Sequence, residues 1–361
     1  MRRFRFFRVF KLLLMCNMEY DAVRGEMVQA GTFRSPVAVA LYFGFILHYI
    51  TQYSYSDAGS FVANFSVIGN YVITNLTILL LVVEQFLRRR KWLTLGRLML
   101  SYVTCRNELF KEIPTFNLGL VLILLQITTV VGSYTLLFVL QLLKHAANSN
   151  FLETIASLIT SMANVYVNIS LVFVQFFAHF VCWEMQQLTL HLKTCPIGSL
   201  LDASDRLVKI KRAIAETLGV RLLLALFHLL VKVSFFGYLG LVYCADRRVS
   251  GNFWFEVIHV MATVLINNSA VLLGVSYSFD CVERKEQEFK NAIKSLQYEA
   301  TEEHSEDYLN FLDLINLKLM TESPKITACG LFTVNLQVFY NVFAAIVTYI
   351  MILFQFRDFE K

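Results

Sequence analysis

Four polar side chains recur on one side of the last apolar segment of the chain. They are Gln337, Asn341, Thr348 and Gln355, and the intervals of 4, 7 and 7 residues between them place all four on one face of an α-helix. Polar groups that face lipid are costly, so this stripe has to face protein or water. Two arrangements would keep the stripe away from lipid. Its side chains could form hydrogen bonds to neighbouring helices, or they could line a water-filled path made by several copies of the helix.

The composition places this segment in a membrane protein. Of the 361 residues, 57% are hydrophobic and 16% are charged, whereas a soluble domain carries about 25% charged residues. No independent soluble domain can be separated, so we expect one membrane domain over residues 1–361. Its expected parts are an N-terminal segment (1–35), helices one to six (36–277), a cytoplasmic segment (278–325), a last helix (326–356) and a tail (357–361).

The expected fold is an all-α membrane protein with seven transmembrane helices. A helix needs about 20 apolar residues to cross the hydrocarbon core. The fourth candidate is interrupted by Asn164, Asn168 and Ser170. The seven candidates are Pro36–Tyr53, Phe61–Phe86, Asn117–Leu143, Ile155–Trp183, Leu222–Cys244, Phe253–Tyr277 and a last segment that ends at Phe356.

Basic residues are spread unequally between the two sides of these spans. The side that holds the N-terminus carries 26 of the 32 Lys and Arg residues, the other side carries 5, and Lys232 lies inside the fifth span. Since cytoplasmic loops are enriched in Lys and Arg, we expect the N-terminus to be cytoplasmic and the C-terminus extracellular. This orientation is the reverse of that in G-protein-coupled receptors and argues against that class.

Other functional classes find little support. No Gly-x-Ser-x-Gly, His-Glu-x-x-His, P-loop or dinucleotide motif occurs, so we expect neither an enzyme nor a cofactor. The seven cysteines match no zinc or redox spacing, and no metal is expected. A transporter more often shows interrupted helices in two related halves. The positive-inside effect explains the basic N-terminus, so nucleic-acid binding is not expected.

The end of the last span has a specific order of residues. Thr348 and Tyr349 are followed by five apolar residues and then by Gln355 and Phe356. This order resembles the C-terminal signature of insect gustatory receptors, and residues 327–332 resemble the start of that family's last helix. The resemblance implies a seven-helix, ligand-gated, nonselective cation channel whose last helix lines the pore. It also implies that this helix divides into a short inner piece and a membrane piece, with Gly330 as the candidate for the break.

The resemblance assigns roles to the matching positions. The amide of Gln355 would solvate a passing cation, and Phe356 or Ile352 would form the apolar constriction that gates by dewetting. Thr348 and Tyr349 would set packing and polarity between subunits. Asn341 belongs to the same polar stripe and is included among the pore residues.

A ligand of such a receptor would bind between spans two and six. Inward-facing aromatic and polar residues there form a candidate region, because apolar pockets with few polar groups suit small organic ligands. Lys232 could reach Glu256, or it could extend toward the inner interface instead. The candidates are Tyr71, Tyr134, Tyr166, Tyr238, Trp254, Glu256 and His259.

The segment between the sixth span and the last helix predicts two amphipathic helices around an acidic linker. Leu309, Leu312, Ile315 or Asn316, and Leu319 recur at helical spacing in the second. In the resembling family, such helices form a cytoplasmic anchor that holds four subunits together. An ordinary helical hairpin is the alternative.

The sequence therefore predicts a gustatory receptor channel in the plasma membrane of sensory neurons. It would act as a homo- or hetero-tetramer with other gustatory receptors and sense small-molecule tastants, with bitter compounds suggested by its compact length. An insect odorant receptor channel is the nearest alternative, and a seven-helix transporter is a further one.

Overall fold

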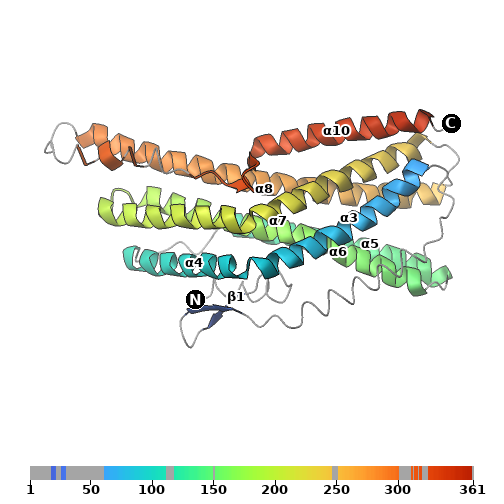
Figure 1. Cartoon of the computed structure of the whole chain (residues 1–361), viewed down its shortest axis with the longest axis horizontal. Helices are drawn as coiled ribbons and strands as arrows, with labels where there is room; N and C mark the ends of the chain where they lie inside the picture. Colours follow the sequence, from blue (N-terminus) through green and yellow to red (C-terminus); the bar gives the residue numbers. More distant parts are fainter. Residues whose placement is uncertain are drawn as a thin grey trace.

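Long helices follow the predicted spans and extend beyond them (Figure 1). A computed structural model describes residues 18–21, 26–29, 61–110, 118–148, 151–245, 251–300, 310–311, 313–315, 317–318 and 324–359. The first predicted span, Pro36–Tyr53, lies outside these residues, as do Met1–Met15. The other predicted spans correspond to α3 (Phe61–Leu87), α5 (Leu118–Asn148), α6 (Phe151–Leu190), α7 (Ile197–Ala245), α8 (Gly251–Ala300) and α10 (Leu336–Phe359).

The prediction of a helical membrane protein is confirmed. Within the described residues, 5 helices are long and apolar enough to cross a membrane, and they lie in α5, α6, α7, α8 and α10. Residues Val72–Leu87 of α3 form a shorter apolar helix. The chain is thus a mostly helical, multi-pass membrane protein, while the count of seven spans and the sides of the two termini remain predictions.

The helices α7 and α8 are much longer than a bilayer requires. They contain 49 and 50 residues, which at 1.5 Å per residue is about 75 Å each, against a hydrocarbon core of about 30 Å. Figure 1 shows them running along most of the long axis, while α10 occupies only one half. The opposite half is built from their basic ends together with α4 (Arg89–Leu109).

Helix α4 was not predicted, although its sequence carries a signal for it. Trp92, Leu95, Met99, Tyr102 and Arg106 are buried, and their spacing of three and four residues is that of one helical face. In the sequence, the basic run that precedes Trp92 stands out as a charge signal and obscures the apolar periodicity behind it. The helix ends where the next residue takes an extended conformation.

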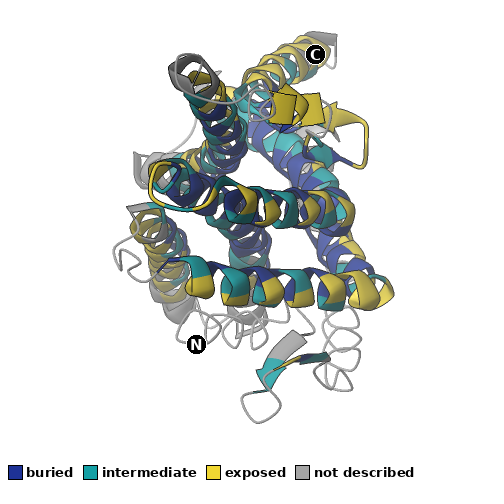
Figure 2. Ribbon diagram, turned by 90° about the vertical axis from the view of Figure 1, so that its left-hand side faces the viewer, coloured by how far each residue is buried: buried dark blue, intermediate teal, exposed yellow. Residues whose placement is uncertain are grey.

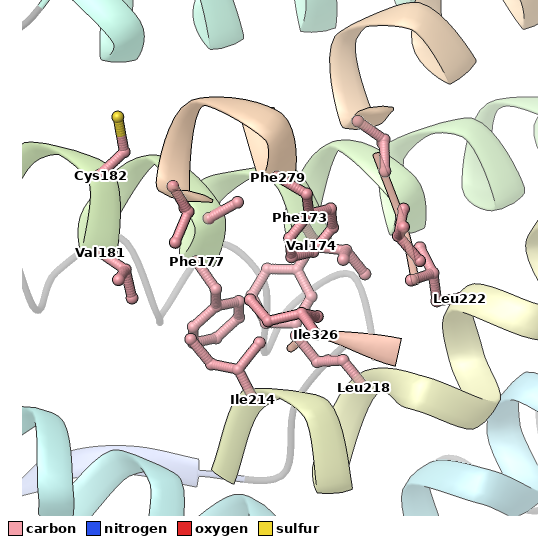
Figure 3. Close-up of a cluster of buried hydrophobic side chains, with 14 of the residues drawn as sticks. Phe173, Val174, Phe177, Val181, Cys182, Ile214, Leu218, Leu222, Phe279 and Ile326 are labelled. Atoms are coloured by element: carbon pink, nitrogen blue, oxygen red, sulfur yellow. The ribbon is translucent and has the colours of Figure 1, made fainter. Parts of the chain in front are cut away.

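Apolar side chains from several helices, aromatic ones among them, form a buried cluster (Figure 3). Phe173 and Phe177 of α6 meet edge to face, with ring centroids 5.0 Å apart, and Trp92 of α4 stacks on Phe173 at 5.6 Å. Phe279 of α8 and Ile214 of α7 belong to the same buried cluster. Each such aromatic pair adds about 0.5–1.5 kcal/mol beyond the area it buries.

Arg221 of α7 lies buried beside this cluster and connects four helices. Its Nη2 donates to Glu84 Oε2 of α3 at 3.2 Å, and its guanidinium lies 5.0 Å from the ring centroid of Trp92 and 5.9 Å from that of Phe173. A buried cation over aromatic faces is stabilised by about 2 kcal/mol or more when it is desolvated. The carboxylate and the two rings together compensate for the loss of water around Arg221.

Two further buried ion pairs lie in the basic half. Arg106 Nη1 of α4 donates to Glu184 Oε1 of α6 at 2.5 Å, and Lys211 Nζ of α7 donates to Glu286 Oε2 of α8 at 2.5 Å. Tyr102 donates to the other oxygen of Glu184 at 3.3 Å. Burial, with the negative charge of Glu184 alongside, raises the pKa of Tyr102, so its hydroxyl remains a neutral donor.

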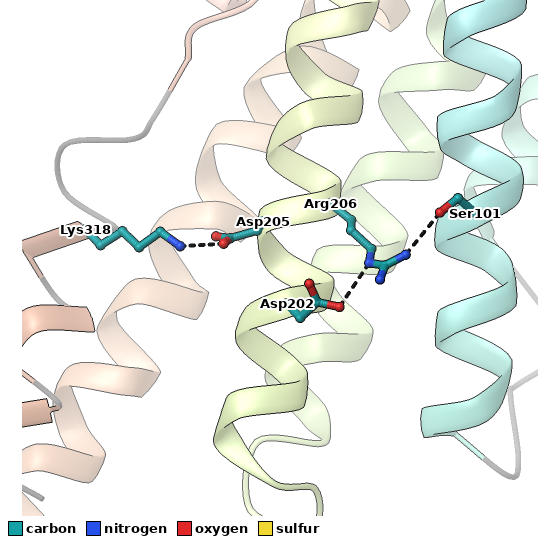
Figure 4. A network of polar contacts seen from close by, with 5 residues as sticks. All are labelled: Ser101, Asp202, Asp205, Arg206 and Lys318. Carbon is teal, nitrogen blue, oxygen red and sulfur yellow. Dashed lines mark hydrogen bonds and ion pairs between the residues drawn. The ribbon is translucent and has the colours of Figure 1, made fainter.

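A polar network on the surface of α7 contrasts with these buried pairs (Figure 4). Arg206 is partly exposed, and it donates at 3.0 Å both to Asp202 and to Ser101 of α4, which are exposed. Asp205 accepts from Lys318, which lies in the helical residues 317–318. Solvent-accessible pairs of this kind contribute about 0–1 kcal/mol each.

Two short antiparallel hairpins complete the described structure. Strands β1 (Met18–Asp21) and β2 (Glu26–Gln29) pair with each other, and Met27 of β2 is fully buried, with β2 packed against α4. Strands β3 (Thr327–Ala328) and β4 (Phe332–Thr333) pair just before α10. The N-terminal hairpin was not predicted from sequence.

Removal of Glu184 tests the importance of the buried pairs. Glu184→Ala leaves the Arg106 charge without its buried partner and should destabilise the protein by about 3–5 kcal/mol. Asp202→Ala, which breaks a solvent-accessible pair with Arg206, should cost less than about 1 kcal/mol. Thermal stability of the detergent-solubilised protein, followed by size-exclusion chromatography, measures both. Equal losses of stability in the two variants would show that the buried Arg106–Glu184 pair matters no more than the solvent-accessible pair.

Candidate conducting helix and ligand region

A tight turn, rather than a short helix, leads into the last helix. Residues 324–335 contain no helix, and the chain reverses between β3 and β4 with Leu331 N donating to Ala328 O at 3.0 Å. Cys329 and Gly330, the two central residues of this turn, have φ angles of 55° and 78°, as type I′ turns require. The expected break at Gly330 is present, but the inner piece that precedes the membrane helix is a hairpin.

The hairpin is held against α7. Val334 N donates to Ile326 O at 3.1 Å, and Ile326 and Ala328 are buried. Backbone atoms of Cys329 and Thr327 lie 3.0 Å and 3.3 Å from the position that a Cβ on Gly219 would occupy. The close approach allowed by Gly219 therefore sets where α10 begins.

Helix α10 has two different sides. Its apolar side packs on the bundle, where Val338 and Ile346 are buried and Phe339, Val342, Phe343, Ile350 and Leu353 are partly buried. Its other side faces away from the chain, as the exposed colouring of the helix that ends at C in Figure 2 shows. The polar stripe of Gln337, Asn341, Thr348 and Gln355 lies wholly on this exposed side.

All six predicted pore residues are exposed in the single chain: Gln355, Phe356, Ile352, Thr348, Tyr349 and Asn341. Phe356 is 57% exposed and Tyr349 is 52% exposed. Two polar groups on the stripe bond within the helix: Thr348 Oγ1 donates to Ala344 O at 2.9 Å, and Asn341 Oδ1 accepts from Gln337 at 3.0 Å. The exposed side thus needs lipid or another chain to cover it.

Helices α7 and α10 touch closely at one glycine. A Cβ on Gly237 of α7 would overlap Cδ1 of Ile350. The next residue, Tyr238, belongs to a small buried cluster with Leu239 and Met261, against which Leu353 of α10 packs. Gly237 and the cluster that begins at the next residue therefore both lie against the packed side of the last helix.

Lys232 has a partner that sequence reasoning missed. It is buried on α7, and its Nζ donates to Asn164 Oδ1 of α6. The ring centroid of Tyr134 on α5 lies 5.9 Å from the same Nζ. Asn164, which the sequence presented as an interruption of the fourth span, lies inside a continuous helix and supplies the acceptor. The side chain of Glu256 lies outside the described residues.

The candidate ligand residues do not share one described cavity. Tyr134 lies beside Lys232, Tyr166 packs against the cluster of Ile78, Leu81, Ala163 and Val167, and Tyr238 belongs to the cluster that contacts α10. Tyr71 lies on α3 and Trp254, Glu256 and His259 lie on α8, but their side chains are outside the described residues.

A hollow of about 740 Å³ lies elsewhere, between the N-terminal hairpin and α4. Its lining includes Glu26, Arg97, Glu108 and Arg206, so charges of both signs surround it. Within the described residues no group of three His, Cys, Asp or Glu side chains is arranged to hold a metal ion.

Comparison with known proteins identifies the family. The sequence profile of the 7tm chemosensory receptors matches residues 4–360. The chain belongs to the 7tm chemosensory receptor family. No curated protein matches this chemosensory receptor by sequence.

The structure of this chemosensory receptor is similar to that of an insect olfactory receptor. OR5 from Machilis hrabei in complex with eugenol has a TM-score of 0.59 at 14% sequence identity, over 89% of this chain and 88% of that chain. A second structure of OR5 from Machilis hrabei gives the same TM-score at 12% identity and the same coverage. At this identity the likeness establishes the fold of the receptor.

The contact at Gly237 predicts a coupling between α7 and α10. Gly237→Ala should destabilise the receptor by about 1–3 kcal/mol, because the added methyl group overpacks against Ile350. Truncating the neighbour as well, in Gly237→Ala with Ile350→Ala, should cost less than the sum of the two single changes. The thermal stabilities of the unmodified receptor, the two single variants and the double variant, all measured in detergent, complete this double-mutant cycle.

A second glycine provides the control for this cycle. A methyl group added at Gly132 of α5 would meet nothing within 4 Å beyond its chain neighbours and the backbone of its own helix, so Gly132→Ala should leave stability unchanged or raise it by about 0.5–1 kcal/mol. Strictly additive effects at Gly237 and Ile350 would show that the two helices are not coupled there.

Proposed function

We propose that this receptor is an insect gustatory receptor that acts as a ligand-gated, nonselective cation channel. The observation that supports this most directly is the two-sided packing of α10. Its apolar side packs on α7 and α8, while its polar stripe from Gln337 to Gln355 is exposed in the single chain. When several copies assemble around this stripe, the polar side chains line a common water-filled path.

The residues of the exposed side have separate roles in this proposal. The Gln355 amide replaces part of the hydration shell of a passing cation, and Phe356 and Ile352 close the path by excluding water. Tyr349 and Thr348 pack between neighbouring subunits. Asn341, held by Gln337 at 3.0 Å, continues the polar lining deeper into the membrane.

A tetramer of this receptor, alone or with other gustatory receptors, provides the required copies. The helical residues between α8 and α10 support assembly, because Ile315 is buried while Phe311, Leu314 and Leu317 are exposed by 44%, 66% and 62%. Apolar side chains exposed to this degree on a cytoplasmic helix favour burial against another chain. Leu309, Leu312 and Leu319, which the sequence placed on this face, lie outside the described residues.

We propose that ligand binding acts on the conducting path through a movement of α7. A tastant bound among α5, α6 and α7, near Tyr134 and Lys232, would displace α7 against α10. Gly237 and Tyr238 contact Ile350 and the Leu353 cluster one to two turns further along α7. The complex of OR5 with eugenol, a small organic molecule, supports a small-molecule ligand.

An olfactory receptor channel is the second candidate function. The structural likeness to OR5 favours it, whereas the order Thr348-Tyr349, five apolar residues, Gln355-Phe356 favours the gustatory branch. Either receptor would act in the plasma membrane of sensory neurons.

Replacing Gln355 tests the conducting role. Gln355→Ala removes the amide beside the proposed constriction, and we expect the ligand-evoked current or the relative cation permeability to change on the order of tenfold, equivalent to ~1.4 kcal/mol. Surface expression should stay near that of the unmodified receptor. Gln287→Ala, the same change at an exposed position on α8, is the control. Unchanged currents in Gln355→Ala would remove this residue from the pore.

The side of the membrane that holds the C-terminus tests the orientation. A tag placed after Lys361 should be labelled by antibody on intact cells, because seven spans with a cytoplasmic N-terminus place the C-terminus outside. A tag before Met1 should be labelled only after permeabilisation. The reverse pattern would argue against the inverted topology and against a pore whose Phe356 constriction lies near the extracellular end.

A further inference from the structure

Two cysteines from different helices lie with their sulfurs in contact. Cys182 of α6 and Cys281 of α8 have their Sγ atoms 2.6 Å apart, and both are free thiols. Disulfide formation needs sulfurs about 2.05 Å apart and Cβ atoms about 3.5–4.5 Å apart. The two helices already hold the two sulfurs close to bonding distance.

The pair lies at the end of the membrane region, on the basic side of the molecule. Cys182 is two residues before Glu184 of the buried ion pair, and Cys281 follows Asp280. Cys182 is 7% exposed, whereas Cys281 is only half-buried. In the proposed orientation this is the cytoplasmic end, where small oxidants reach Cys281 first.

Nearby charges favour reaction at Cys281. Arg284 and Lys285 are three and four residues further along α8, on the same face of the helix. Each of these basic side chains also forms an ion pair. Arg284 lies 3.3 Å from Asp280, and Lys285 lies 2.6 Å from Glu288. A partly exposed thiol beside basic side chains has more thiolate character than a buried one, and the thiolate is the reactive form.

We propose that Cys182 and Cys281 form a site of reversible oxidation by hydrogen peroxide. The Cys281 thiolate attacks one peroxide oxygen, the O–O bond breaks, and the released hydroxide takes up the thiol proton as water, leaving a sulfenic acid. The Cys182 sulfur then attacks the Cys281 sulfur, the S–O bond breaks and a second water leaves. Two thiols thus become one disulfide while peroxide is reduced to two waters.

The resulting bond would join α6 to α8, two helices that pack along much of their length. Near the pair they already share a polar contact, because Ser278 Oγ lies 3.1 Å from His179 Nε2. A covalent link adds a constraint that non-covalent contacts lack: it prevents α6 and α8 from sliding past each other. Cytosolic glutathione would reverse it, since thiols attack accessible disulfides.

Peptide mapping of the full-length receptor tests the proposal. Membranes from cells lysed in an alkylating agent give the resting state, and membranes treated with hydrogen peroxide before alkylation give the oxidised state. We expect a Cys182–Cys281 cross-linked peptide to increase at least about tenfold with peroxide and to disappear after incubation with reduced glutathione. Cys182→Ser and Cys281→Ser should each abolish it, while Cys329→Ser, which removes an exposed thiol, should not.

Three outcomes would overturn the proposal. They are the absence of the cross-linked peptide in the peroxide-treated unmodified receptor, a glutathione adduct on Cys281 in its place, and a cross-link already complete in the resting state. Because the first comparison uses the unmodified receptor, the test does not depend on whether the serine variants fold. The readout is chemical, so its result is independent of the proposed channel activity.

Discussion

The buried guanidinium of Arg221 is the constraint on which the basic half of the bundle depends. A positive charge inside a membrane protein must be compensated by protein groups, because neither lipid nor water is available to it. Glu84 of α3 supplies a carboxylate, and Trp92 of α4 and Phe173 of α6 supply ring faces. Compensating the charge of Arg221 therefore fixes the positions of α3, α4 and α6 relative to α7.

Buried ion pairs also determine which helices are neighbours in the basic half. Arg106 with Glu184, and Lys211 with Glu286, join α4 to α6 and α7 to α8. Such pairs add little net stability compared with apolar packing, but each excludes arrangements that would leave a charge buried alone. They specify which helices lie next to each other where the long helices leave the apolar region.

The sequence predicts the spans well because lipid imposes a strong and local rule. Runs of apolar residues of sufficient length must become helices, and α3, α5, α6, α7, α8 and α10 all correspond to such runs. Other features depend on residues far apart in the chain. Asn164 interrupts an apolar run when read alone, and only the packing of α6 on α7 shows that it accepts a bond from Lys232.

The start of the last helix was harder to predict for a different reason. Residues 326–335 are apolar and β-branched enough to extend a helix or to form strands, and the backbone conformation of Cys329 and Gly330 decides between the two. The candidate site was partly predictable: periodicity identified the stripe on α10, but not which side of that helix packs on the bundle. Packing places Val338 and Ile346 inward and leaves the stripe outward.

The length of α8 has a mechanical consequence. A continuous helix of 50 residues is about 75 Å long, and a hydrogen-bonded helix transmits rotation with little bending. A tilt of about 3° around one end displaces the other end by about 4 Å over that length. A small tilt at one end of α8 would therefore displace its other end by most of one helical turn. Because α8 runs along most of the long axis (Figure 1), such a tilt would couple opposite ends of the molecule.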